Sequence, residues 1–246
     1  MSANQGKMRL DQLLVTKELV ESRHRAQAMI MAGLVLIDGQ LVTKAGTMVA
    51  MDVPLVIKQK LPFVSRGGQK LEKALDSFNI NVTDKICLDV GASTGGFTDC
   101  LLQHGAKKVY ALDVGHGQLD VKLRNDPRVI NIENTNIRYF EKVGLPETPD
   151  LAVIDVSFIS LDKVLPAVYK LVKIKGEIIA LIKPQFEAGP KRAKGGVVRD
   201  SAVHVEIIDR IKVFSQIQAM EVLGVIESPL LGPAGNKEFF IHLIKS

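Results

Sequence analysis

A glycine-rich segment that follows an apolar run is the first feature of the chain that could support chemistry. Residues 88–97 read LDVGASTGGF, the pattern of a strand end, a tight turn and the start of a helix. Glycines in such a turn let the backbone approach a ligand closely at the carboxyl edge of a parallel sheet. A plain turn needs fewer small residues, so this segment predicts a cofactor loop.

The polar residues after the next apolar runs indicate a cofactor that carries a nucleoside. Asp113 ends the second run, where a carboxylate can accept hydrogen bonds from two ribose hydroxyls. The glycine spacing is G-x-x-x-G-G rather than the G-x-G-x-x-G of dinucleotide folds, and the absence of a following Gly-Lys-Ser/Thr excludes a P-loop. Asn134 and Asn136, after the third run, are candidates for the adenine side, with a surface turn as the equal alternative.

Four charged residues stand where a folded sheet could gather them. Asp155 and Lys183 follow the fourth and fifth apolar runs, Lys70 lies on the helix before the first run, and Glu238 opens the last run. The ends of parallel strands meet at one edge of a sheet, which is where open α/β folds bind ligands. We expect the four side chains to converge there; a lone surface charge is the alternative for each one taken singly.

The loop at residues 88–97 resembles the S-adenosylmethionine motif of class I methyltransferases, in which an acidic residue lies two positions before the first glycine. The resemblance implies that Asp89 lies near the methionine end of the cofactor. It also implies that the last strand is antiparallel to the others, so that Glu238 begins at the edge where the other strands end. The implied cofactor-binding residues are Asp89, Gly91, Ser93, Gly95, Gly96, Phe97, Asp113, Asn136 and Asp155.

The set Lys70, Asp155, Lys183 and Glu238 resembles the Lys-Asp-Lys-Glu tetrad of FtsJ-like ribose 2′-O-methyltransferases. A ribose hydroxyl is a poor nucleophile, so its methylation requires a general base or stabilisation of developing negative charge. The resemblance implies that Lys183 is the central catalytic residue, that Asp155 and Glu238 orient it, and that Lys70 helps to place the target hydroxyl. The sequence is compatible with Lys183 acting either as the general base or as the group that stabilises the developing negative charge.

Residues 1–60 are predicted to form a separate α+β module. Serine at position 22 can cap the second of two short helices, and Gly33 is a plausible stop for it. Asp38-Gly39 lies between two β-prone runs and is typical of a tight hairpin. The apolar positions that recur at helical spacing are Leu10, Leu13, Leu14, Ala26, Met29 and Ile30.

This module resembles an S4 domain, a small RNA-binding fold, through its Arg-Leu-Asp start, Ser-Arg helix opening and hairpin. An S4 module fused to an FtsJ-like domain resembles the TlyA, or haemolysin A, family, which methylates cytidine riboses in ribosomal RNA. The resemblance implies S-adenosylmethionine as cofactor and ribosomal RNA or ribosomal subunits as partner. The basic residues expected to contact RNA are Arg9, Arg23, Arg25, Arg66, Lys191, Arg192 and Lys194.

Two further segments near the predicted site have functional readings. The basic, glycine-rich segment 189–199 follows Lys183 and could close over an RNA backbone, with a disordered surface loop as an equal alternative. Ser157 and Phe158 follow Asp155, and an aromatic ring there could stack on a flipped base. A place in the core is an equal alternative for Phe158.

The remaining chain alternates between apolar runs and helical stretches. A linker is predicted at residues 61–68 and a helix at 69–78, followed by five short apolar runs at 86–90, 108–113, 129–132, 151–155 and 177–182. Runs of this kind are typical of strands that are buried on both faces. The predicted fold class is α/β, a small α+β S4 domain followed by a class I (Rossmann-like) methyltransferase domain at residues 69–246.

Composition excludes several other classes of protein. The chain has 246 residues, a formal charge of +5 and only two cysteines, so neither a disulfide framework nor a Cys/His metal site is expected. No run reaches the roughly 18 apolar residues of a membrane span, and no signal peptide is recognised. We expect a cytoplasmic protein without membrane contact; the sequence gives no oligomeric state. Residues 1–73 hold 11 Lys and Arg against six Asp and Glu, so the whole charge excess lies there.

Three rival functions are less compatible with the sequence. Base N-methyltransferases commonly carry Asn/Asp-Pro-Pro-Tyr/Phe after the fourth strand, whereas this chain has Asp155-Val-Ser-Phe. A membrane-lysing haemolysin needs an exposed amphipathic or spanning segment, and the apolar runs here are short. An RNA-binding protein with an inactive methyltransferase domain is the third rival, and the intact tetrad disfavours it.

Overall fold

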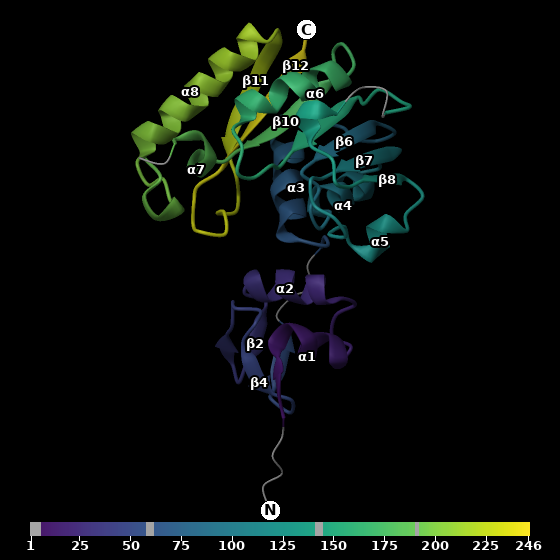
Figure 1. Ribbon diagram of the computed structural model, residues 1–246, viewed down its shortest axis with the longest axis vertical. Coiled ribbons are helices and arrows are strands. Elements are labelled where there is room, and N and C mark those ends of the chain that lie inside the picture. Colours follow the sequence, from purple (N-terminus) through teal and green to yellow (C-terminus); the bar gives the residue numbers. More distant parts are fainter. Residues whose placement is uncertain (1–5, 58–61, 141–144, 190–191) are drawn as a thin grey trace, which may run out of the picture. The chain divides into compact units, whose positions relative to one another are not determined.

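The computed structural model describes residues 6–57, 62–140, 145–189 and 192–246 (Figure 1). The contacts within the chain define two compact units, residues 1–68 and residues 69–246. The boundary falls in the first turn of helix α3, Arg66–Phe78.

The first unit is a small α+β module. Helices α1 (Leu10–Thr16) and α2 (Arg23–Met31) pack on a three-stranded sheet of order β3-β2-β5, and the six predicted core positions of the helices are all buried. The Ser22 hydroxyl accepts from the Arg25 N–H at 3.2 Å, which confirms the predicted cap. Asp38 and Gly39 have φ of +49° and +76°, so the predicted hairpin is confirmed. The strands are β2 (Val35–Ile37), β3 (Gln40–Leu41) and β5 (Leu55–Ile57).

Two strands of this module are not among the predicted elements. Strand β1 (Lys7–Arg9) pairs antiparallel with β4 (Met48–Ala50). Each has three residues, too few for an alternating pattern to stand out in the sequence. The pair fixes the approach to α1, because the Leu10 and Asp11 N–H groups donate to the carbonyls of Thr47 and Ala45.

Helix α3 begins at Arg66 rather than at the predicted residue 69, so the end of the predicted linker is helical. The two glycines lie in the first turn, where backbone N–H groups have no intrahelical acceptor in any case. A Cβ at Gly68 would lie 2.3 Å from Cγ of Phe63, so this glycine reflects close packing rather than a break in structure. Residues 58–61 of the predicted linker lie outside the described residues.

The second unit is built on a seven-stranded sheet of order β11-β12-β10-β9-β6-β7-β8 (Figure 1). The five predicted parallel strands are present, and the last strand is antiparallel to its neighbours as expected. The seven strands of the sheet are β6 (Ile86–Val90), β7 (Lys108–Leu112), β8 (Val129–Ile132), β9 (Leu151–Ile154), β10 (Glu177–Ile182), β11 (Met220–Glu227) and β12 (Phe239–Lys245).

Helices cover both faces of this sheet. Alternate strand residues such as Ile241 and Leu243 join the core beneath α6 (Leu165–Leu171) and α8 (Ser201–Ile217). Their neighbours Phe240 and His242 point the other way, because their rings contact Phe97 of α4 (Gly96–Gln103) and Phe78 of α3. Short helical segments of the unit include α5 (Val121–Arg124), α7 (Pro184–Glu187) and the 3-10 helix η3 (Leu161–Lys163).

Strand β11 is the one long strand that the sequence pattern did not predict. It lies at an edge of the sheet, pairs with β12 alone, and has only one buried residue, Met220. A bulge interrupts its register between Val222 and Gly224. An edge strand of this kind lacks the continuous apolar run that identifies the buried parallel strands.

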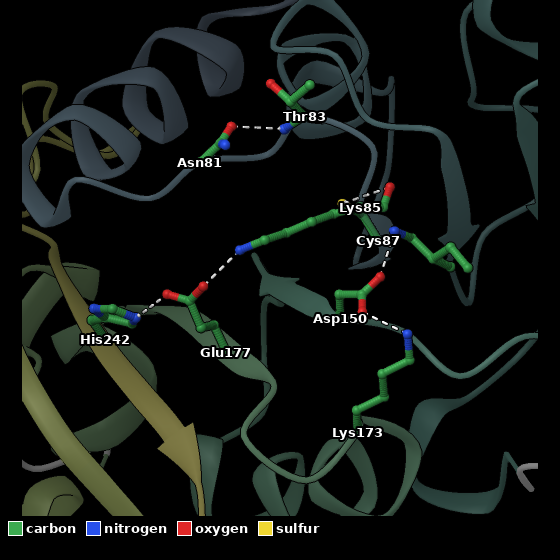
Figure 2. A network of polar contacts seen from close by, with 9 residues as sticks. Asn81, Thr83, Lys85, Cys87, Asp150, Lys173, Glu177 and His242 are labelled. Carbon is green, nitrogen blue, oxygen red and sulfur yellow. Dashed lines mark hydrogen bonds and ion pairs between the residues drawn. The ribbon is translucent and has the colours of Figure 1, made fainter.

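Ion pairs fasten the amino edge of the sheet, as Figure 2 shows. Glu177, at the start of β10, accepts from Lys85 at 2.7 Å and contacts His242 of β12 at 2.8 Å. Asp150, just before β9, accepts from the Ile86 N–H at 2.9 Å and from Lys173 at 2.6 Å. These contacts tie the starts of β6, β9 and β10 together and leave the carboxyl edge to the loops that form the site.

Candidate functional site

A cavity of about 800 Å³ opens at the carboxyl edge of the sheet. The loops after β6, β7, β8 and β9 line it, together with Phe186 of α7. A volume of this size is typical of pockets for cofactors and drug-sized ligands, which span roughly 300–1,000 Å³. Of the predicted cofactor-binding residues, those that line it are Gly91, Ser93, Asp113, Asn136 and Asp155.

The turn between β6 and α4 is shaped by close backbone contacts. Gly91 has φ +87°, and a Cβ there would lie 2.5 Å from the carbonyl oxygen of Asp155. Ser93 has φ +49°, and its N–H donates to Asp113 Oδ2 at 2.8 Å, while the Gly115 N–H donates to Oδ1 at 2.7 Å. Asp113 thus holds two loops at the cavity, and each of its oxygens keeps a lone pair for a ligand hydroxyl.

Asp89 lies beneath the cavity, completely buried. Its Oδ2 accepts from the Thr98 hydroxyl at 2.7 Å. Its Oδ1 is buried with no hydrogen-bond partner within the part of the chain that the structure describes. Burial raises the pKa of this carboxyl to about 7, against the opposing effect of the Thr98 hydrogen bond. This oxygen is an acceptor for which the described residues provide no donor.

The other predicted loop residues pack in the core instead of lining the cavity. Gly95 precedes α4 with φ +93°, and a Cβ there would lie 2.2 Å from Cδ1 of Leu123. Gly96 and Phe97 are buried in α4, where Phe97 packs on Phe240. Gly95 therefore allows α4 and α5 to approach each other, a packing role that its sequence pattern does not distinguish from ligand contact.

The two candidate asparagines have different positions. Asn136 lines the cavity and caps a short 3-10 helix, η1 (Ile137–Tyr139), by accepting from the Arg138 N–H at 3.1 Å. Asn134 is exposed, has φ +52°, and lies 3.3 Å from the His116 ring nitrogen. Asn134 therefore matches the alternative of a surface turn.

The four residues of the predicted tetrad form two ion pairs. Lys183 Nζ lies 2.5 Å from Asp155 Oδ1 and donates to the Ser157 hydroxyl at 2.9 Å. Lys70 Nζ donates to Glu238 Oε2 at 2.6 Å, and both of these side chains are largely buried. The register pairs Ile182 with Phe239, which brings Lys183 and Glu238 to the ends of neighbouring strands. The four residues of the predicted tetrad are therefore arranged as two pairs of opposite charge.

Phe158 is 90% exposed, so its alternative reading as a core residue is wrong. It has φ +63°, a conformation that is unusual for a residue with a bulky side chain. Its ring lies 4.9 Å from the ring of Phe186, and both residues line the cavity. Two aromatic rings therefore stand at the rim, next to the segment that holds Lys183.

The cavity has further lining residues that sequence reasoning missed. They come from the same strand-end loops, so their position after β7, β8 and β9 was the available signal. Which of them turn inward depends on loop conformations that apolar periodicity does not encode. The polar members of this set are Gln118, Thr135, Arg138, Ser160 and Lys163.

In the first unit, a buried carboxylate organises two of the predicted RNA-binding arginines. Asp11 is completely buried and accepts from Arg9 at 3.0 and 2.9 Å, from Arg23 at 3.0 Å and from Gln27 at 2.8 Å. These hydrogen bonds, Arg9's first, hold the pKa of Asp11 well below its ordinary value despite burial. Both arginine side chains remain substantially exposed, at 40% and 49%, and are fixed on one buried anchor.

The other predicted RNA-binding residues have varied environments. Arg25 donates to the Phe63 carbonyl at 3.4 Å, and Arg66 opens α3. Arg192 makes a two-point ion pair with Glu206 of α8, at 2.5 and 2.8 Å. Asn236 fixes the end of this segment by bonding Gly196 and Val198. Lys191 and the side chain of Lys194 lie outside the described residues.

The described residues contain neither a membrane-spanning helix nor a metal-binding cluster. No helix there is long and apolar enough to cross a membrane. No cluster of three or more His, Cys, Asp or Glu side chains with metal-binding geometry was found in the same residues.

The strand order, the antiparallel β12 and the cavity at the carboxyl edge define the class I methyltransferase fold. Magnesium protoporphyrin IX methyltransferase of Synechocystis, solved with bound S-adenosylhomocysteine, shares this fold at 13% identity and a TM-score of 0.52. The match covers 73% of this chain and 84% of that one.

The chain belongs to the FtsJ-like methyltransferase family, whose model matches residues 63–245, and an S4 domain model matches residues 8–52. Hemolysin A of Brachyspira hyodysenteriae is 46% identical over 240 residues, covering 96% of this chain and all of the relative. A Mycobacterium tuberculosis protein named 16S/23S rRNA (cytidine-2′-O)-methyltransferase TlyA is 43% identical over 238 residues, covering 96% and 89%. A structure from Streptococcus thermophilus, described as a candidate hemolysin, is 46% identical with a TM-score of 0.79, covering 98% and 90%. The predicted resemblance is confirmed.

Proposed function

We propose that this protein transfers the methyl group of S-adenosylmethionine to the ribose 2′-hydroxyl of a cytidine in ribosomal RNA. The observation that carries the proposal is the Lys183 ammonium, held between Asp155 and Ser157 beside a cofactor-sized cavity. The relatives named as rRNA (cytidine-2′-O)-methyltransferases support the choice of substrate.

The residues around the cavity suit this cofactor. Asp113 has lone pairs for the ribose hydroxyls, Asn136 lies on the adenine side of the predicted loop order, and Asp89 offers an orphaned buried acceptor below the turn. When bound, S-adenosylmethionine supplies an electrophilic methyl group. Gly91 keeps the floor of the loop free of a side chain, since a Cβ there would collide with the Asp155 carbonyl.

Lys183 has the central catalytic role in this proposal. Its ammonium would hold the 2′-oxygen of the target and stabilise the negative charge that this oxygen gains as its proton passes to water. Asp155 and Ser157 fix the direction of the ammonium group. Lys70, on helix α3, contributes a second positive group, whose charge is balanced by Glu238 just before β12.

The remaining polar and aromatic groups of the chain suggest how RNA is held. Phe158 and Phe186 offer ring faces at the rim, on which an extruded base can stack. Arg9 and Arg23, fixed by Asp11, form a positive pair suited to phosphates. We place this activity in the cytoplasm, with ribosomal RNA or a ribosomal subunit as the partner.

The function is tested by methyl transfer from labelled cofactor to ribosomal subunits and to naked ribosomal RNA. Lys183→Ala should lower kcat on the order of 10²- to 10⁴-fold, the range for a lost catalytic group. Lys173→Ala is the matched control, because Lys173 pairs with Asp150 at 2.6 Å on the opposite edge of the same sheet. It should retain wild-type kcat.

Mass spectrometry of the product decides between rival chemistries. A methyl group on the ribose of a cytidine supports the proposal, whereas a methyl group on a base contradicts it. Absence of transfer to both substrates by the wild-type protein would leave the rival reading of an inactive, RNA-binding methyltransferase domain.

A further inference from the structure

Glu187, the last residue of α7, is a nearly buried carboxylate beside the proposed active site that no catalytic role uses. Its side chain is 2% exposed. Oε1 accepts from the Leu161 N–H at 2.8 Å, and Oε2 accepts from the Ser160 hydroxyl at 2.6 Å and from Arg210 of α8 at 2.7 Å. Two of its three donors therefore belong to the segment that follows β9.

The segment after β9 and the segment after β10 are joined by three successive contacts. Lys183 forms an ion pair with Asp155 and donates to Ser157, the ring of Phe186 packs on that of Phe158, and Glu187 accepts from Ser160 and Leu161. The three contacts follow the same order along both segments. The first contact contains the proposed catalytic groups, the second forms the aromatic rim, and the third closes the loop where η3 begins.

The middle contact requires support from the other two. Phe158 is 90% exposed, so burial does not hold it in place. Its φ of +63° lies in the left-handed region, which a phenylalanine adopts only when its surroundings enforce it. The loop is anchored at Asp155 by the end of β9 and at Ser160 and Leu161 by Glu187.

We propose that Glu187 is a positioning residue for the proposed methyl transfer, an inference that rests on the proposed function. By fastening the loop at residues 160–161, it holds Asp155 and Ser157 against Lys183 and presents the Phe158 ring at the rim of the cavity. Arg210 supplies the cationic partner of this buried carboxylate.

A carboxylate at this position is specific, because all of its partners are donors. In Glu187→Gln the new amide NH₂ must face either the Leu161 N–H or the Arg210 guanidinium, and both are donors. The loop contact is thereby weakened at nearly constant side-chain volume. Small displacements of catalytic groups cost large factors in rate, so kcat should fall about 10- to 100-fold.

Asp150→Asn is the matched control. Asp150 also accepts from one backbone N–H and one cation, Ile86 and Lys173, but at the amino edge of the sheet (Figure 2). Both substitutions should lower Tm, whereas Glu187→Gln alone should lower kcat. Affinity for the cofactor, measured by calorimetry, should be retained in Asp150→Asn and should change less than kcat in Glu187→Gln, since Gly91, Ser93 and Asp113 lie on other loops.

A reporter that is independent of activity separates this inference from the proposed function. The chain has no tryptophan, so Phe158→Trp introduces a single tryptophan as a reporter on the loop. In that background Glu187→Gln should lower the steady-state fluorescence anisotropy of the reporter, and Asp150→Asn should leave it unchanged. Absence of methyl transfer by the wild-type protein would overturn the proposed function, while the anisotropy would still decide whether Glu187 positions the loop.

Two further variants complete the test. Adding Arg210→Leu to Glu187→Gln removes the opposing guanidinium, so the amide can face the Ser160 oxygen while its carbonyl accepts from Leu161; kcat and anisotropy should both recover in part. Should Glu187→Gln fail to fold, Ser160→Ala removes one donor alone, and both readouts should fall. Unchanged anisotropy and kcat in the folded variants would overturn the inference and leave Glu187 with a role in folding only.

Discussion

Two buried aspartates of this chain have opposite charge preferences because their partners differ. Asp11 receives hydrogen bonds from Arg9, Arg23 and Gln27, which favour its ionised form. Asp89 receives one neutral hydroxyl, from Thr98, and burial raises its pKa to about 7. The Asp11 carboxylate is a fixed anion inside the S4 unit, whereas the pKa of the Asp89 carboxyl, beneath the turn between β6 and α4, lies near neutral pH.

Asp89 gives a prediction with a definite sign. In the unfolded chain this carboxyl ionises near 3.8, and in the folded protein near 7, so the folded state binds more protons between these values. The stability of the cofactor-free protein should therefore fall as pH rises from about 4 to about 7. Asp89→Asn removes this loss, so its gain in Tm over wild type should grow across that window and then level off.

Thermal unfolding at several pH values checks this prediction. Asp126→Asn is the control, because the Arg128 partner lowers the pKa of Asp126 below its ordinary value of 3.8. The effect of this substitution on Tm should therefore change with pH only below the range tested for Asp89. A gain for Asp89→Asn that does not change between pH 4 and 7 would contradict the raised pKa of Asp89.

At the scale of elements, the sequence predicted what burial makes regular. Of the five parallel strands, β6, β7, β9 and β10 are almost entirely buried and leave continuous apolar runs, whereas edge strand β8 has two exposed residues; the predicted bounds were close for all five. Edge strand β11 and the three-residue strands β1 and β4 have no such pattern. The glycines at 67 and 68 resembled a linker, because the close packing of Gly68 on Phe63 depends on the local backbone conformation, which residue type does not show.

The candidate site was predictable to the same extent. Strand topology gathers Asp113, Asp155 and Lys183 at one edge, and counting strand ends was enough to find them. The partition of the tetrad into two ion pairs depends on rotamers and register, and the role of Glu187 depends on a loop that returns to it. Neither leaves a signal in residue spacing.

The amino edge of the sheet supplies an element-scale prediction. The contact with His242, then that with Lys85, lowers the pKa of Glu177 from 4.5 to about 2. Its contribution to stability is therefore present above pH 4.5 and lost as pH falls toward 2. Glu177→Gln should lower the free energy of unfolding at pH 6, and the difference from wild type should shrink between pH 4.5 and 3.

Urea unfolding at pH 3, 4, 5 and 6 measures this difference. Glu227→Gln is the control, because Glu227 pairs with Lys237 at an exposed site, where an ion pair contributes roughly 0–1 kcal/mol. A pH-independent deficit for Glu177→Gln would mean that packing of the side chain, rather than its charge, joins β10 to β6 and β12.

For the whole molecule, the distribution of charge matters more than its sum. A formal +5 over 246 residues is small, yet residues 1–73 carry all of the excess. In the S4 unit, part of that charge is held in a fixed pair by Asp11. Binding to phosphates by such a unit releases counterions, so RNA affinity should depend on salt mainly through the first unit.

Deletion of residues 1–60 tests this division of labour. RNA affinity should fall, and the slope of log K against log salt should become shallower by about 2 to 3, since Arg9, Arg23 and Arg25 each neutralise about one phosphate. Cofactor affinity should persist, because every residue lining the cavity lies between Val90 and Phe186. Calorimetric titration of both proteins with cofactor provides the check on folding. Unchanged RNA affinity would refute the S4 unit as the anchor, whereas loss of cofactor binding would mean that the catalytic unit needs the first unit in order to fold.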